Sequence, residues 1–163
     1  MNEFIIQMVS GLSPELSTFL LATLPVTELR ASLPLGITVF EVQPLLALIL
    51  SLLGNIVPLI AIFLLLPRIV VWAKKHSPWF SKVLDRYFLR LEKKHKESYD
   101  RWGALALILF VAIPLPGSGV WTGSIVAILF GVEKRYSIPA ILTGLLISGL
   151  IVMMITQGAI QIL

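Results

Sequence analysis

Three long stretches without a charged residue restrict the fold of this chain more than any other feature. Val42–Pro67, Trp102–Val132 and Tyr136–Leu163 run for 26, 31 and 28 residues without Asp, Glu, Lys or Arg. Each could fill a hydrocarbon core of about 30 Å, which takes about 20 apolar residues in a helix. Only 13% of all residues are charged, against about 25% in soluble domains. The sequence therefore predicts an all-α integral membrane protein.

Most of the charge lies in one connecting segment. Ten of the thirteen Lys and Arg residues fall within Arg68–Arg101, and such an excess is typical of cytoplasmic loops. We therefore expect residues 73–102 in the cytoplasm. Ser77-Pro78 predicts a helix start, and apolar residues recur at helical spacing over Phe80–Leu91. This pattern indicates an amphipathic helix on the inner leaflet, which anchors the chain or binds anionic lipid headgroups. The net charge of +4 then reflects topology, and we expect no nucleic-acid partner.

Two of the four apolar regions are continuous. Residues 44–72 and 137–163 have no internal cluster of helix breakers, and Pro44 and Pro139 stand near their starts, where a missing N–H costs little. Both regions predict single transmembrane helices.

The other two regions, residues 1–43 and 103–132, are interrupted by clusters of Pro, Gly, Ser or charged residues. The interruptions fall at residues 25–32, between arms at Leu16–Leu24 and Leu33–Val42, and at residues 114–119, between arms at Gly103–Ile113 and Val120–Val132. At 1.5 Å per residue the arms of the second of these regions cover about 16–20 Å, too little to cross alone, and the arms of the first are likewise only half-length. Each region is therefore either one kinked helix that still spans or a re-entrant hairpin.

Charge placement favours two hairpins. A re-entrant second region returns Lys134-Arg135 to the cytoplasm, together with the rest of residues 133–136, whereas a kinked span leaves both cations outside. The ends of the first region carry Glu3, Glu15 and Glu41 and no Lys or Arg, so the first hairpin is expected to enter from outside. We expect one membrane domain over residues 1–163, with two hairpins, two spans and a basic connector.

An internal repeat is consistent with this arrangement. Pro25 aligns with Pro114, and a further shift of six residues aligns Pro44 with Pro139 and Gly54 with Gly149. Each half then consists of a hairpin followed by a spanning helix, and the halves would be inverted across the membrane. Inverted repeats with broken helices and a site near the midplane are characteristic of secondary transporters.

Glu28 and Arg30 are the most informative pair of residues, because both lie inside a predicted membrane hairpin. Ionised side chains there are costly and usually mark a pathway, although a shallow tip would let both reach interfacial water. Residues i and i+2 on a helix do not face each other, so we expect no direct salt bridge. Arg30 suits a phosphate or carboxylate. Glu28 suits a proton or Na⁺ as coupling ion, since a low-dielectric cavity favours the protonated carboxyl group.

Further candidates are uncharged. Ser32 follows the charged pair, and Asn55 is a polar residue deep in a span, where it could contact the substrate or bond to another helix. The second interruption offers backbone groups, a helix N-terminus and hydroxyls, although it could equally be a tight structural turn. Its candidate binding residues are Pro114, Pro116, Gly117, Ser118, Gly119, Trp121 and Thr122.

Enzymatic functions fit the sequence poorly. Gly117-Ser118-Gly119 resembles a nucleophile turn, but a serine nucleophile needs a base, and the two histidines, His76 and His95, lie in the basic connector. There is no phosphate-binding loop and no His-Glu-x-x-His motif, and the chain has no cysteine. We expect no catalytic residue, no metal site and no organic cofactor.

Two stretches carry a family resemblance. Glu28–Gly36 (ELRASLPLG) and Ile113–Gly123 (IPLPGSGVWTG) resemble the signature segments of the putative small multidrug export protein family, and the resemblance covers nearly the whole chain. That family is similar in plan to the DedA/VTT group, whose members are assigned two opposed re-entrant hairpins and are implicated in moving lipid carriers or phospholipids with proton or sodium dependence. The resemblance implies a multi-pass transporter in the cell membrane of a bacterium or archaeon. Unlike DedA-type hairpins, the second tip is uncharged.

The sequence thus predicts an ion-coupled transporter or flippase for a lipid-linked, amphipathic or anionic substrate, with membrane lipid as a partner. Because two hairpins and two spans enclose little volume, a homodimer is one arrangement that the sequence allows, although the sequence does not fix the oligomeric state. The alternative is a scaffold that transports nothing and binds anionic lipid or a partner through Phe80–Leu91.

Overall fold

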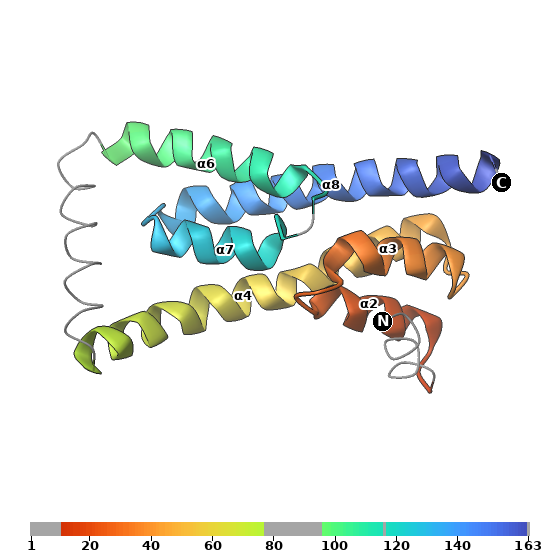
Figure 1. The fold of residues 1–163 in the computed structure, drawn as a ribbon, viewed down its shortest axis with the longest axis horizontal. Coiled ribbons are helices and arrows are strands. Elements are labelled where there is room, and N and C mark those ends of the chain that lie inside the picture. Colours follow the sequence, from red (N-terminus) through yellow and green to blue (C-terminus); the bar gives the residue numbers. More distant parts are fainter. Residues whose placement is uncertain (1–10, 77–95, 116, 163) are drawn as a thin grey trace. The chain divides into compact units, whose positions relative to one another are not determined.

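The computed structural model describes residues 11–76, 96–115 and 117–162, and every regular element in these ranges is a helix (Figure 1). The described residues form six helices: α2 (Pro14–Thr23), α3 (Glu28–Thr38), α4 (Pro44–His76), α6 (Lys96–Ala112), α7 (Val120–Leu129) and α8 (Lys134–Ile162). The predicted amphipathic helix at Phe80–Leu91 and the candidate residue Pro116 lie outside the described residues. The all-α prediction is confirmed for the described part.

In the part of the chain that the structure describes, two helices are long and apolar enough to cross a membrane. They cover Pro44–Trp72 of α4 and Lys134–Ile162 of α8, at 29 residues each. The span predicted at 44–72 is therefore confirmed as a helix. The helix predicted to open near Pro139 instead begins five residues earlier, at Lys134. A proline so close to the start removes a single hydrogen bond of the second turn, so the helix passes through it.

Both interruptions are present, but the first is shorter than predicted. The break between α6 and α7 matches residues 114–119 closely. The break between α2 and α3 ends at Thr27, and α3 begins at Glu28 rather than at Leu33. The charged residues therefore stand in the first turn of a helix, and Pro34 lies within that helix.

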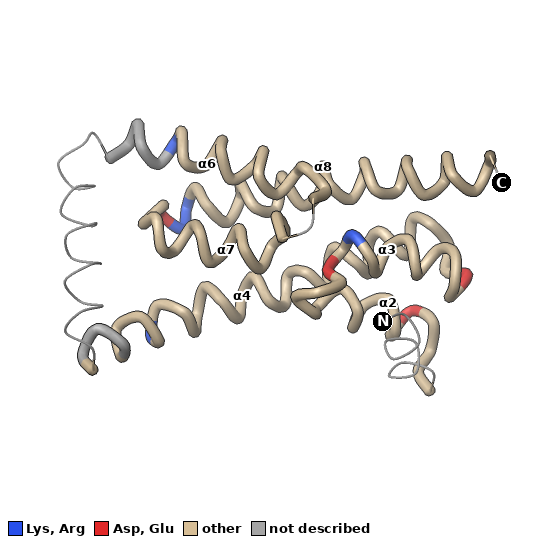
Figure 2. The backbone as a smooth tube through the Cα atoms, viewed as in Figure 1, with Lys and Arg blue, Asp and Glu red and all other residues tan. Residues whose placement is uncertain are grey.

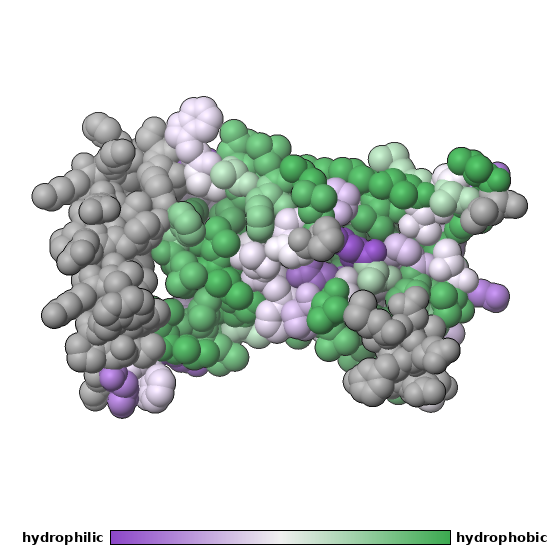
Figure 3. All heavy atoms as spheres, viewed as in Figure 1, coloured by the Kyte–Doolittle hydropathy of each residue, from purple (hydrophilic) through white to green (hydrophobic). Residues whose placement is uncertain are grey.

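Polarity is distributed as in a membrane protein. Charged residues are few along the drawn helices (Figure 2), and apolar side chains dominate the visible surface (Figure 3). Along α4 the side chains of Leu45, Leu53 and Leu64 are about half exposed, whereas Ser51 and Asn55 are buried. In a soluble protein large apolar residues are mostly inside. An apolar exterior of this extent needs a hydrocarbon environment.

The helices form two compact units. The first contains Met1–Pro58 and Leu146–Leu163, and the second contains Leu59–Leu145. In the first unit α2 and α3 pack against each other. A Cβ atom added at Gly54 of α4 would lie 2.5 Å from the Phe19 carbonyl oxygen and 2.6 Å from the Ala22 Cβ of α2. Glycine is therefore required where α4 meets α2.

The second unit is built in a similar way. Helices α6 and α7 pack against each other. A Cβ atom added at Gly144 of α8 would lie 2.7 Å from the Ile108 carbonyl oxygen and 2.9 Å from the Val111 Cβ of α6. At the start of α8 the Lys134 ammonium donates a hydrogen bond of 3.3 Å to the Phe63 carbonyl of α4.

Candidate functional site

The centre of the candidate site is an ion pair in the first unit. Arg30 Nη1 donates to Glu28 Oε2 at 2.8 Å, and the two side chains are 16% and 9% exposed. The expectation that these residues would not meet was wrong. Glu28 has φ of 44°, which is left-handed, so its side chain does not leave the backbone in the direction that the i, i+2 rule assumes. Such a conformation costs a non-glycine residue about 1–2 kcal/mol.

Bonds within the α2–α3 turn hold Glu28 in this conformation. The Glu28 N–H donates to the Leu24 carbonyl at 3.0 Å. The Thr27 hydroxyl donates to the Leu21 carbonyl in the last turn of α2, so Thr27 ties the turn to α2 and does not cap α3. Strained residues that persist because their surroundings hold them occur mainly at functional sites. The turn thus positions a carboxylate and a guanidinium together.

A line of buried polar groups continues from the pair into α4. Glu28 and Ser32 lie four residues apart on α3, and Ser51 and Asn55 lie four apart on α4. The Ser32 and Ser51 hydroxyls form a hydrogen bond of 2.9 Å. Asn55 Nδ2 donates to the Ser51 carbonyl at 2.9 Å. The inter-helix contact is thus made by the serines, whereas Asn55 bonds within its own helix.

The amide oxygen of Asn55 is the group in this line with an unused bonding capacity. Asn55 is 1% exposed, and its Oδ1 accepts no hydrogen bond from the described residues. A buried acceptor without a donor costs about 1–3 kcal/mol, and the bilayer offers no water to satisfy it. This oxygen can accept a hydrogen bond from a donor group or coordinate a cation.

The second interruption is a closed turn in the second unit. Ser118 is buried, and its hydroxyl donates within the turn. The hydroxyl oxygen lies 2.8 Å from the Ile113 carbonyl oxygen and 2.9 Å from the Leu115 carbonyl oxygen, and both carbonyls accept from it. Gly117 has φ of 80°, a conformation that glycine adopts without strain. Gly119 is the N-cap of α7. The hydroxyl of Ser118 therefore closes the turn.

The predicted site residues fall into two groups. Glu28, Arg30, Ser32 and Asn55 share the first unit, and the interactions above connect Glu28 with Arg30 and Ser32 with α4. The second group belongs to the second unit, where Pro114, Trp121 and Thr122 are half-buried. Sequence reasoning missed Ser51, although its spacing of four from Asn55 in an otherwise apolar span was a usable signal.

Comparison with known families supports the resemblance seen in the sequence. The model of the family described as "Putative small multi-drug export protein" matches residues 28–151, more than two thirds of the chain. This chain belongs to that family. The matched segment begins at Glu28, directly after the first interruption, and contains the second interruption. No curated protein and no solved structure shows a significant similarity to the chain. Family membership and the two long apolar helices identify a membrane protein of an export family, and the relation to the DedA/VTT group stays a prediction.

Proposed function

We propose that this member of the small multi-drug export family is an ion-coupled transporter or flippase for an anionic amphiphile, multi-pass in the cell membrane of a bacterium or archaeon. The observation that carries the proposal is the buried Glu28–Arg30 pair. An ionised side chain in the membrane costs about 2.5–3.5 kcal/mol on insertion scales. Buried ion pairs are often no more stabilising than apolar side chains of similar volume. Two charges in a strained turn of a mostly apolar chain are therefore better explained by function than by stability.

The pair provides a physical basis for coupling. A phosphate or carboxylate on the substrate matches the planar guanidinium of Arg30 in bidentate geometry. When the substrate anion takes the place of the carboxylate, Glu28 loses its counter-charge and binds a proton or Na⁺ instead. Arg30 therefore always has an anion beside it, and Glu28 always has a cation or a proton. Binding of substrate and of coupling ion thereby become linked.

The polar line gives the coupling ion further ligands. The Asn55 amide oxygen accepts no hydrogen bond from the described residues, and the Ser32 and Ser51 hydroxyls lie 2.9 Å apart between α3 and α4. Hydroxyl, amide and carboxylate oxygens are ligands that hard cations accept. We assign these oxygens to the coupling ion and Arg30 to the substrate.

A repeat with re-entrant hairpins is the proposed architecture. The contacts that Gly54 makes with Phe19 and Ala22 correspond to those that Gly144 makes with Ile108 and Val111. Phe19 and Ala22 precede their counterparts by 89 residues, the same shift that aligns Pro25 with Pro114. This correspondence supports a repeat in which Gly54 matches Gly144 rather than Gly149. The sequence shift between the two halves is then almost constant.

Cysteine accessibility tests the topology, and the chain suits it because it contains no cysteine. Single cysteines replace Leu12, Glu41, Lys96 and Lys134, and an impermeant maleimide is applied to intact cells and to inverted vesicles. We expect the first two positions to react from outside and the last two from inside. A residue 134 that reacts from outside would contradict the re-entrant second hairpin.

Transport is tested in proteoliposomes with two anionic probes. Phosphatidylglycerol with a fluorescent headgroup reports flipping through its accessibility to dithionite, and trapped carboxyfluorescein reports export of a small anion. We expect the wild-type protein to move one of the two. Glu28→Gln and Arg30→Ala should each abolish movement, whereas Glu15→Gln, at an exposed acid of α2, should not. Wild-type rates in folded Glu28→Gln and Arg30→Ala proteins would refute the mechanism.

The same variants, compared in a lipid-binding assay, test the scaffold alternative. If the basic connector carries the function, neutralising its Lys and Arg residues should abolish lipid binding, and the variants at Glu28 and Arg30 should behave as wild type.

A further inference from the structure

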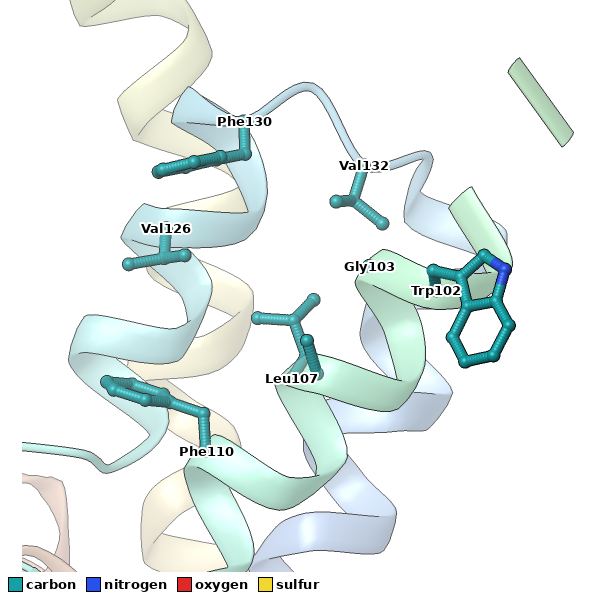
Figure 4. A pocket seen from close by; sticks show the side chains of 8 residues that line it. Trp102, Gly103, Leu107, Phe110, Val126, Phe130 and Val132 are labelled. Carbon is teal, nitrogen blue, oxygen red and sulfur yellow. The ribbon is translucent and has the colours of Figure 1, made fainter. Parts of the chain in front are cut away.

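An apolar groove lies between α6 and α7 in the second unit. Its volume is about 430 Å³, within the roughly 300–1,000 Å³ that ligand sites usually have. Figure 4 shows Val126 of α7 and Phe130, which directly follows that helix, on one side, and Leu107 and Phe110 of α6 on the other. The lining residues are Trp102, Gly103, Ala106, Leu107, Phe110, Val126, Phe130 and Val132.

Small residues create the hollow. Gly103 and Ala106 stand three residues apart on α6, between the larger side chains of Trp102 and Phe110. At Gly103 an added Cβ would lie 3.0 Å from the Val132 side chain, so glycine lets the segment after α7 come close. Phe110, Phe130 and Trp102 are 37%, 49% and 70% exposed. The aromatic side chains at the edge of the groove are therefore exposed, and the groove is open at the protein surface.

The lining selects a hydrocarbon. None of the lining side chains carries a charge or a hydroxyl group, and the indole N–H of Trp102 is their single polar group. Ligand sites for polar molecules contain a few placed polar groups that orient the ligand. This groove instead matches a flexible apolar chain. From Trp102 to Phe110 the helix rises about 12 Å, which accommodates the upper part of an acyl chain.

The chain around one end of the groove is cationic. Trp102 directly follows the segment 68–101, which contains ten basic and four acidic residues. Val132 directly precedes Glu133, Lys134 and Arg135, a further excess of one positive charge. Tryptophan is enriched at the membrane–water interface. The groove thus runs from Trp102 and Val132, which directly adjoin these charged segments in the sequence, into the apolar part of α6.

We propose that this groove binds one acyl chain of an anionic phospholipid, taken from the leaflet that faces the basic connector. The apolar lining holds the chain. Arg101 adjoins the lining residue Trp102 in the sequence, and Lys134 and Arg135 follow closely after Val132. These cations attract the headgroup, since each Lys or Arg near an anionic surface contributes about 1 kcal/mol. A lipophilic cation would meet the same apolar lining but a repulsive interface. The site is distinct from Glu28 and Arg30, and it binds lipid whether or not the protein transports it.

Electron paramagnetic resonance of chain-labelled lipids tests the proposal. The full-length protein is placed in phosphatidylcholine vesicles containing phosphatidylglycerol with a spin label on one chain. Ala106 is exposed, so Ala106→Trp fills the groove without disturbing the core. Leu109→Trp, on an exposed part of the same helix outside the groove, is the matched control. We expect the motionally restricted component to fall in Ala106→Trp and to persist in Leu109→Trp.

The second measurement is the dependence of lipid restriction on salt concentration and on the charge of the headgroup. Restriction of labelled phosphatidylglycerol should exceed that of labelled phosphatidylcholine at low ionic strength, and the difference should shrink at about 1 M salt, where the screening length is about 3 Å. An equal restriction of both lipids would overturn the choice of an anionic lipid. An unchanged component in Ala106→Trp would overturn the site.

Two further outcomes decide between occupants. Disulfide-linked dimers of an Ala106→Cys protein, formed in the bilayer, would place a second copy over the groove and overturn the proposal. Protection of that cysteine from a membrane-soluble maleimide by added phosphatidylglycerol would support it. These measurements involve no transport, so the two proposals can fail separately. Wild-type transport in Glu28→Gln would refute the proposed function without affecting this site, whereas an unchanged restricted component in Ala106→Trp would refute this site without affecting the proposed function.

Discussion

Removing one member of the Glu28–Arg30 pair should destabilise the chain more than removing both. The two charged groups are 2.8 Å apart and nearly buried, at 9% and 16% exposure. Near 4 Å between charge centres, an effective dielectric constant of 20 gives an attraction of about 4 kcal/mol. Desolvation of both groups offsets most of this attraction. A single substitution removes the attraction but leaves the remaining charge desolvated.

The magnitude follows from this asymmetry. Breaking a buried pair costs about 3–5 kcal/mol, and the partial exposure of Arg30 places Arg30→Met at about 3 kcal/mol. In the double variant Glu28→Gln/Arg30→Met no buried charge remains, and we expect a cost of about 1 kcal/mol, because apolar replacement of buried pairs is often close to neutral. With about 3 kcal/mol for each single variant and about 1 kcal/mol for the double variant, the coupling free energy between the two positions is about 5 kcal/mol, within the range of about 1.5–7 kcal/mol measured for close charge pairs.

Unfolding in mixed micelles of a mild detergent and dodecyl sulfate, followed by tryptophan fluorescence, measures these free energies. The wild type, Glu28→Gln, Arg30→Met and the double variant complete one cycle. Glu133 and Arg135 form an exposed pair of 2.6 Å in the second unit, and the same cycle there should give less than about 1 kcal/mol. If the Glu28–Arg30 cycle is additive, the pair does not compensate buried charge and the reasoning fails.

Three other predictions concern packing and the polar line. Gly54→Ala should destabilise the protein by about 1–3 kcal/mol because the new methyl group overlaps the backbone of α2. The control, Gly158→Ala, adds its methyl group in open space and should be neutral. Thermal unfolding compares the two variants. Ser118→Ala should lower stability by about 1 kcal/mol without abolishing transport, because its hydroxyl closes a turn; a stable but inactive protein would instead place it at the substrate. Asn55→Leu should weaken the dependence of transport on the proton or Na⁺ gradient while folding is retained, and an unchanged ion dependence would remove Asn55 from the coupling site.

Much of the fold could be predicted from the sequence because it is encoded locally. The break at residues 114–119 concentrates two prolines and two glycines in six residues. Such a cluster ends a helix, whereas the single prolines Pro34 and Pro139 lie within helices. The span from Pro44 follows from an uncharged apolar run alone. The start of α3 was placed five residues too late because residues 25–32 were treated as one polar interruption. In the structure a single left-handed residue, Glu28, lets the helix restart immediately after Thr27.

The sequence allows the residues of the site to be predicted, but not the contacts between them. That Glu28 and Arg30 are functional candidates follows from the cost of charge in a membrane. Their contact depends on one backbone angle, and no sequence pattern gives the sign of φ for a glutamate. The Ser32–Ser51 bond joins residues on two helices, so it depends on how α3 packs on α4. The groove between α6 and α7 was missed for the same reason, because Gly103 produces a hollow only when Val132 lies against it.

Packing in a bilayer explains why glycines and buried hydroxyls occur together in this chain. Lipid tails are as apolar as leucine, so helices gain no hydrophobic free energy by meeting and depend on close contact and inter-helix hydrogen bonds. Gly54 brings α4 against the backbone of α2, and the Ser32–Ser51 bond joins α3 to the same helix. These contacts fix α2, α3 and α4 together on both sides of the α2–α3 turn. The turn can then hold Glu28 at a positive φ, and the charged pair keeps its geometry.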